Sequence, residues 1–217
     1  MTTDLKQQSS PQPTTRNILA SGDQRAFIPY PAIGENLEHV PVHARPDLHY
    51  YIARMGFLPY TITLYMHIPW IAEYLFKLNN AVMRDERNSL PERFKYRLSM
   101  IASRDNECTY CTAHHAATLK RRWGYGETDL LDLLHLEPTD DRERVAFEFV
   151  HQASLDPKGV TGDLRRRLAA AFTPQEVMEI VLVVGFWKMY NTMHTAMGVP
   201  LEDPVAAEAK WVEVGPR

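Results

Sequence analysis

Apolar residues recur at helical spacing over most of the chain, and no stretch alternates convincingly between apolar and polar positions. Capping residues, prolines and glycines mark the ends of these segments, and Ser89-Leu90-Pro91-Glu92 is typical of a capping box. The pattern predicts helices over 46–56, 69–82, 90–101, 107–123, 127–136, 139–155, a shorter one after Thr161, and 177–197.

The last of these segments, 177–197, is the most apolar, and part of it is ambiguous. Residues 180–184 are mostly β-branched and could form a strand by themselves. Thr173 and Glu176 form a second capping box before the segment, and Gly198 follows it, so we expect one long helix. A helix that is apolar on nearly all sides belongs in a core or in an oligomer interface.

These elements predict an all-α protein, a single-domain bundle of about seven to eight helices. Few residues before Phe27 can be buried, so we expect a disordered tail over 1–26. An extended proline-rich arm over 27–46, the helical domain over 47–201 and a C-terminal tail over 202–217 complete the predicted organisation.

Composition and charge exclude several classes of protein. The 24 Lys and Arg residues against 27 Asp and Glu residues give a net charge of −3, which argues against a nonspecific nucleic-acid binder. The longest apolar run, 180–187, falls far short of the about 20 residues that span a bilayer. The N-terminus lacks the apolar segment of a signal peptide. We therefore expect a cytoplasmic protein with neither nucleic-acid nor membrane partners.

Candidate chemistry is concentrated in the two cysteines of the chain, which form the motif Cys-x-x-Cys-x-x-x-His with Cys108, Cys111 and His115. On a helix these three residues share one face, and His114 is turned away from it. A helix start near Glu107 would stabilise a thiolate through its free N–H groups and its dipole. Low-pKa thiols of this kind carry out thiol–disulfide exchange or peroxide reduction.

Two other interpretations of the cysteines stay open. They could be ordinary core residues of a buried helix. They could also bind zinc together with one or both of His114 and His115, and a more distant histidine could complete such a site. The candidates for that distant ligand are His135, His151 and His194.

At this motif the sequence resembles the alkyl hydroperoxidase D-like branch of the carboxymuconolactone decarboxylase family. The resemblance rests on residues 107–115, which follow a helix opened by residues 90–93. The apolar helix ending at 184–191 and the segment 197–200 look like the closing part of that family, and the similarity covers about 48–201.

The resemblance implies a helical bundle that assembles into homo-oligomers, either trimers or hexamers. It also implies a peroxiredoxin-type thiol peroxidase in which Cys111 attacks the hydroperoxide, Cys108 resolves the product and His115 belongs to the proton relay. An external dithiol, such as a lipoylated or thioredoxin-like protein, would supply the reducing equivalents. We therefore expect no metal and no other cofactor.

The sequence departs from the family pattern at one position of the relay. The family carries a glutamate twelve positions before the first cysteine, and this chain has Tyr96 there. A phenol has a pKa of about 10 and is a poor base at neutral pH, although it can donate a hydrogen bond. Glu107 and Glu92 are the candidate substitutes.

Two other functions are alternatives on the same fold. A lactone decarboxylase would bind its substrate among Trp187, Tyr190 and Asn191 with His115 as base, but that branch of the family lacks the cysteine pair. A non-catalytic oligomeric protein would use the arm and the apolar helix only for assembly.

Overall fold

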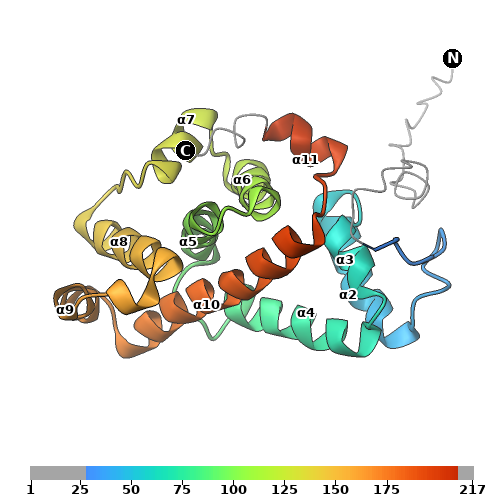
Figure 1. Ribbon diagram of the computed structural model, residues 1–217, viewed down its shortest axis with the longest axis horizontal. Helices are drawn as coiled ribbons and strands as arrows, with labels where there is room; N and C mark the ends of the chain where they lie inside the picture. The colour runs from blue at the N-terminus through green and yellow to red at the C-terminus, as the bar shows by residue number, and fades with distance from the viewer. Residues whose placement is uncertain (1–27, 210–217) are drawn as a thin grey trace, which may run out of the picture. The chain divides into compact units, whose positions relative to one another are not determined.

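The computed structural model describes residues 28–209. In this part of the chain the regular elements are ten α-helices and two short 3₁₀ helices, with no strand (Figure 1). The all-α class predicted from the sequence is therefore confirmed. Eight of the α-helices overlap the predicted ones, and the pattern did not indicate α3 and α11, which have six residues each.

In chain order the elements are η1 (Val42–Ala44), α2 (Arg45–Met55), α3 (Tyr60–Tyr65), α4 (Pro69–Arg84), α5 (Glu92–Asp105), α6 (Thr109–Trp123), α7 (Glu127–Leu134), α8 (Asp141–Leu155), η2 (Pro157–Gly159), α9 (Gly162–Ala171), α10 (Pro174–Met197) and α11 (Asp203–Glu208).

The described chain divides into two compact units, residues 28–74 and 75–209, and the division falls inside α4. The predicted disordered tail, 1–26, lies outside the described residues, and α11 falls within the predicted C-terminal tail. The domain boundaries drawn from the sequence stay predictions.

In the first unit, residues 28–41 form no helix or strand. Ile33 and Leu37 are nevertheless buried, and only 1% of the surface of each residue is exposed to solvent. The guanidinium of Arg45 donates a hydrogen bond to the carbonyl oxygen of Val40 at 2.9 Å, which ties the end of this segment to the start of α2.

In the second unit, α5 is the central helix and packs against α6, α7, α8 and α10 (Figure 1). Its residues Leu98, Met100 and Ile101 are completely buried. The helix α10 also packs against α6, and α11 packs against α6 as well. The motif helix α6 is therefore enclosed by α5, α10 and α11, and these three elements supply the surroundings of the cysteines.

The ends of α10 form as the sequence predicts. The N–H of Thr173 donates to the Glu176 carboxylate at 2.8 Å, and the N–H of Glu176 donates to the Thr173 hydroxyl at 3.3 Å, which is a capping box. Gly198 ends the helix in the left-handed region with φ of 60°.

One face of α10 is buried and another is exposed in this single chain. Ile180 and Val183 are completely buried, whereas Met178 and Leu182 keep 56% and 49% of their surface exposed. The homo-oligomer expected from the family resemblance stays a prediction.

The capping box predicted at the start of α5 is wrong. Pro91 occupies the cap position, and no side chain caps this end of the helix. The N–H groups of Ser89 and Leu90 donate instead to the carboxylate of Glu179 in α10, at 2.7 and 3.0 Å. A residue of a distant helix therefore satisfies the donors ahead of α5.

The same carboxylate forms a buried ion pair. The ammonium of Lys95 in α5 lies 2.8 Å from the Glu179 carboxylate, and the Lys95 side chain is fully buried. Lys95 also donates to the carbonyl oxygen of Val82 at 2.9 Å, so the pair connects α10, α5 and the end of α4.

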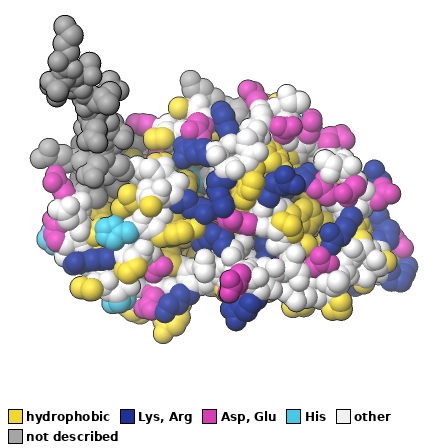
Figure 2. Space-filling view, turned by 180° about the vertical axis from the view of Figure 1, so that it is seen from behind, with side chains coloured by type: hydrophobic (Ala, Val, Ile, Leu, Met, Phe, Trp, Pro, Cys, Tyr) yellow, Lys and Arg dark blue, Asp and Glu magenta, His cyan; other side chains and the backbone are white. Residues whose placement is uncertain are grey.

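The surface carries charges of both signs. Figure 2 shows basic side chains on one face of the molecule with acidic ones among them. Across residues 28–209, none of the helices combines the length and the apolar character that crossing a bilayer requires.

We expect Glu179→Ala to destabilise the protein by about 3–5 kcal/mol, because it leaves the Lys95 ammonium buried without its partner. Equilibrium unfolding in urea measures the change. The double variant Lys95→Met/Glu179→Leu should recover most of the loss, since a well-packed apolar pair replaces the charges. Equal losses in the single and double variants would contradict this account of the pair.

Candidate active site

The turn between α5 and α6 fixes the position of the first cysteine. The N–H of Glu107 donates to the carbonyl oxygen of Arg104 and the N–H of Cys108 donates to that of Ser103, both at 2.9 Å. These two bonds and the left-handed conformation of Glu107, with φ of 55°, form a Schellman motif. Cys108 thereby closes α5 and also occupies the N-cap position of α6.

Both cysteines are free thiols at the start of α6, and each is 2% exposed. The helix begins at Thr109, two residues later than predicted, so Cys108 precedes its first turn. The Cys108 sulfur accepts a hydrogen bond from the N–H of Cys111 at 3.4 Å. In this way it satisfies one of the free donors of the helix end.

A histidine of α10 lies against the second cysteine. Nδ1 of His194 is 3.1 Å from Sγ of Cys111. The His194 ring packs edge-on against Tyr110 and Tyr190, with ring centroids 5.4 and 5.5 Å apart. The sequence indicated His194 only as a distant zinc ligand, because no spacing rule connects it with the motif.

His115 makes no hydrogen bond to either cysteine. Its Nδ1 lies 3.3 Å from the hydroxyl of Ser103 in α5, and its Nε2 has no hydrogen-bond partner. Ser103 donates in turn to Asn191 at 3.1 Å. His115 shares a helix face with Cys111 but points toward α5 and Trp187, whose ring centroid is 4.1 Å away. The histidine in contact with Cys111 is therefore His194, and the role of His115 in a proton relay stays a prediction.

The electrostatic environments of the two thiols are opposite. Hydrogen bonds from the Cys111 side chain and N–H lower the pKa of Cys108 to about 7, against the opposing effect of burial. The pKa of Cys111 is raised well above its usual value, chiefly by burial and further by Cys108. At neutral pH, Cys108 is therefore substantially a thiolate and Cys111 a neutral thiol.

The two buried histidines are neutral bases. Burial is the main cause that lowers the pKa of His194 to about 3, and His114 is a further one. Burial is likewise the main cause that lowers the pKa of His115 to about 3. The Cys111 thiol is thus a donor placed between two acceptors, the Cys108 sulfur and Nδ1 of His194.

Tyr96 lies beside His115, whereas the two candidate substitutes for the relay glutamate, Glu92 and Glu107, have side chains that reach solvent. Tyr96 packs its ring edge-on against His115, with centroids 5.8 Å apart. Glu92 forms an ion pair with Arg122, and both side chains are partly exposed. The Glu107 side chain is exposed, and its contribution to the site is the backbone conformation of the turn.

The predicted substrate pocket residues surround the histidines. Trp187 contacts His115, and its indole N–H has no hydrogen-bond partner. Tyr190 packs against His194 and donates its hydroxyl to the carbonyl oxygen of Leu75 at 3.1 Å. Asn191 accepts from Ser103, so its polar group is already paired.

A hollow of about 470 Å³ is lined by residues of the α5–α6 turn, α8 and α10. Its lining includes Glu107, which directly precedes Cys108, and Thr195, whose side chain hydrogen-bonds to Cys108. Lys188 and Ser154 line another part of it. Neither cysteine lines the hollow, and Cys108 is separated from it by these neighbouring residues.

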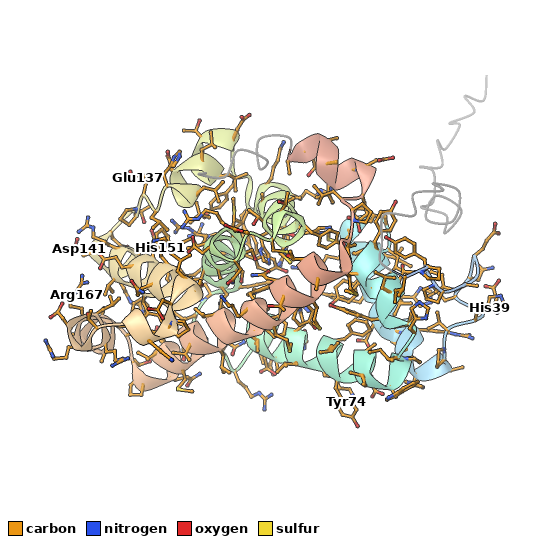
Figure 3. The ribbon with its side chains drawn as sticks, in the orientation of Figure 1. His39, Tyr74, Glu137, Asp141, His151 and Arg167 are labelled. Atoms are coloured by element: carbon orange, nitrogen blue, oxygen red, sulfur yellow. The ribbon has the colours of Figure 1, made fainter. Side chains whose placement is uncertain are left out.

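The zinc interpretation can be compared with the geometry. The ligand atoms of Cys108, Cys111 and His194 lie within 4.8 Å of one another, and residues 28–209 add no fourth Cys, His, Asp or Glu to this group. Of the other candidates, His151 of α8 (Figure 3) lies 2.9 Å from the Asp105 carboxylate and is not part of this group. The set is one ligand short of a closed tetrahedral structural site, so it does not fit structural zinc.

Comparison with known proteins places the fold. No protein-family model matches the chain. The uncharacterized protein YnjA of Escherichia coli is 25% identical over 168 residues, which cover 76% of this chain and 92% of YnjA.

Several solved structures are similar to this one, among them those of a peroxidase-related protein and a debrominase. A peroxidase-related protein from Ralstonia eutropha, described as an alkylhydroperoxidase AhpD core, is 19% identical with a TM-score of 0.73, covering 83% of this chain and 94% of that one. The debrominase Bmp8, as a cysteine-to-alanine variant in complex with 2,3,4-tribromopyrrole, is 20% identical with a TM-score of 0.69, covering 79% and 91%.

At these identities the similarity establishes the fold. The chain has the fold of alkylhydroperoxidase AhpD-like proteins, and the resemblance inferred from its sequence is confirmed at that level.

We expect iodoacetamide to distinguish the two thiols by pH. Alkylation of Cys108 should rise with a midpoint near its pKa of about 7, because only the thiolate reacts. Cys111 should stay unmodified until a much higher pH, since its pKa is raised. Peptide mass spectrometry after brief labelling measures both curves. Identical midpoints for the two cysteines would show that the described environments are wrong.

Proposed function

We propose that the protein is a thiol-dependent hydroperoxide reductase that alternates between a dithiol and a Cys108–Cys111 disulfide. The observation that carries this proposal is the contact of Cys111 with a neutral imidazole at 3.1 Å, next to a second thiol at a helix N-terminus. A thiolate, a proton donor and a proton acceptor are then aligned within one buried cluster.

In the first step, the Cys108 thiolate attacks the distal oxygen of the hydroperoxide. A sulfur–oxygen bond forms, the O–O bond breaks, and Cys108 becomes a sulfenic acid while the hydroperoxide is reduced to an alkoxide. The alkoxide takes up one proton from solvent, which balances the proton that Cys108 lost on ionisation. The lowered pKa of Cys108 supports this choice of attacking sulfur.

In the second step, the Cys111 sulfur attacks the sulfenic sulfur of Cys108. His194 accepts the thiol proton through Nδ1, the disulfide forms, and the leaving hydroxide takes that proton and departs as water. This order reverses the roles that the family resemblance implies, in which Cys111 attacks first. The reversal follows from the helix N-terminus, because only Cys108 occupies its cap position.

An external dithiol completes the cycle by reducing the disulfide through thiol–disulfide exchange. We propose a lipoylated or thioredoxin-like protein for this role. The buried location of both sulfurs, each 2% exposed, favours a slender reductant arm or a small dithiol over a bulky monothiol.

The lactone decarboxylase alternative has less support in this geometry. Its expected base, His115, is buried, and its Nδ1 already lies 3.3 Å from the hydroxyl of Ser103. Its expected pocket residues, Tyr190 and Asn191, already use their polar groups in hydrogen bonds within the protein.

The cysteine roles can be tested with single variants and cumene hydroperoxide. Cys108→Ser should abolish turnover with a dithiol, because the attacking sulfur is gone. Cys111→Ser should stop after one equivalent and leave a sulfenic acid on Cys108 that dimedone labels. Dimedone on Cys111 in the Cys108→Ser variant would support the opposite order, and full turnover in both variants would exclude the disulfide cycle.

A halogenated pyrrole should be assayed in parallel, since a debrominase shares the fold. Disulfide formation with the pyrrole but not with hydroperoxides would contradict the proposed substrate class. Stoichiometric zinc that blocks alkylation of both cysteines would exclude the disulfide cycle altogether.

We expect His194→Gln to slow disulfide formation by about 100-fold, the usual contribution of a positioned general base. The matched variant His115→Gln should slow it far less, because His115 makes no hydrogen bond to either sulfur. Stopped-flow tryptophan fluorescence, or acid quenching followed by mass analysis, measures both rates. A larger loss in His115→Gln than in His194→Gln would restore the relay that the resemblance implies.

A further inference from the structure

A buried carboxylate ahead of α11 reaches the motif helix. One oxygen of Glu202 accepts the hydroxyl of Tyr110 at 2.8 Å, and the other lies 2.7 Å from Nε2 of His114. Glu202 is only 4% exposed. Its sequence position lies in the predicted C-terminal tail, and none of the sequence-based candidates for a carboxylate in the site included it.

The burial of Glu202 calls for an explanation, because a buried carboxylate is costly unless both oxygens are paired. Here each oxygen has a partner, and both partners come from adjacent turns of α6. Another acid of the same region, Glu208, also contacts α6 but pairs with Arg121 at 2.9 Å where both side chains are about 30% exposed. Glu208 therefore forms an ordinary surface ion pair, whereas Glu202 is buried against the helix that carries the cysteines.

The two partners of Glu202 connect it with the thiols. The ring of Tyr110 lies between two imidazoles, with centroids 4.3 Å from His114 and 5.4 Å from His194. His194 in turn contacts Cys111 at 3.1 Å. A row of three rings thus runs from the carboxylate to the thiol pair.

His114 is also one of the groups that act on the thiol site. It is among the causes that lower the pKa of Cys108, after the hydrogen bonds from Cys111 and Thr195. After burial, it is also a cause that lowers the pKa of His194. The residue that Glu202 holds therefore influences both Cys108 and His194.

We propose that Glu202 is the positioning carboxylate of the thiol site, holding the His114 imidazole and the Tyr110 ring beside His194, which contacts Cys111. It acts through these residues and touches neither sulfur. It supplies the carboxylate that the chain lacks at Tyr96, from the segment ahead of α11. The catalytic consequence rests on the proposed function, whereas the effect on the thiols stands independently of any substrate.

Other titratable groups form a contact network with the cysteine pair. They are His194 and Tyr190 of α10, Tyr110, His114 and His115 of α6, Tyr96 of α5 and Glu202 ahead of α11. Glu107 of the α5–α6 turn is exposed.

The test measures the pH midpoint of Cys108 alkylation in Glu202→Gln, His114→Gln and Tyr110→Phe, with Glu208→Gln as matched control. We expect the midpoint to rise measurably in His114→Gln, since His114 is one of the causes that lower the pKa of Cys108. Glu202→Gln should shift it in the same direction, because it removes the carboxylate that holds His114 in place. Glu208→Gln should leave it unchanged.

Tyr110→Phe keeps the ring and removes one bond to Glu202, so its midpoint should rise less than that of Glu202→Gln. Circular dichroism and thermal unfolding show which variants are folded, and His114→Gln decides the question if Glu202→Gln does not fold. Midpoints of Glu202→Gln and His114→Gln equal to that of Glu208→Gln would overturn the proposal. The alkylation requires no peroxide, so shifted midpoints in a protein that reduces no hydroperoxide would overturn the proposed function and leave this inference standing.

Discussion

The Schellman turn between α5 and α6 is the constraint on which the site depends. Its two backbone bonds make Cys108 the residue that closes one helix and caps the next. The turn requires a left-handed residue, and Glu107 adopts that conformation although it is not glycine. Because the same residue belongs to both helix ends, the Cys108 backbone cannot move without disturbing both α5 and α6. The backbone geometry of this turn thus fixes where Cys108 lies in the fold.

From that geometry, two cysteines three residues apart acquire different properties. Cys108 lies at the helix end, where unpaired N–H groups offset the cost of burying a negative charge. Cys111 lies inside the first turn, where burial dominates and keeps the thiol neutral. Burial acts on His194 in the complementary sense and keeps the imidazole free to accept a proton. One apolar environment therefore prepares both a proton donor and a proton acceptor.

Two buried acids, Glu179 and Glu202, have the same structural role: each connects elements that are distant in sequence. Glu179 of α10 caps the chain ahead of α5 and pairs with Lys95. Glu202 connects the start of α11 with two side chains of α6. In both cases full pairing of the carboxylate offsets its desolvation, and the pairing specifies one arrangement of the helices.

The sequence alone determined the helical class, the ends of α10, the helix of the cysteine motif and the cysteine pair itself. These features depend on residues within one or two turns of each other, so spacing and capping rules are sufficient to predict them. Tertiary structure decided which groups surround the sulfurs: His194 lies 83 residues from Cys111, and Glu202 lies 92 residues from Tyr110. Periodicity places His115 on the same face of its helix as Cys111. Only the packing of α5 against α6 shows that its ring contacts Ser103 of α5, and that the Cys111 thiol contacts His194 of α10 instead. The physical reason is that local periodicity orients a residue about its own helix axis, whereas the contacts of its ring depend on which other helix packs there.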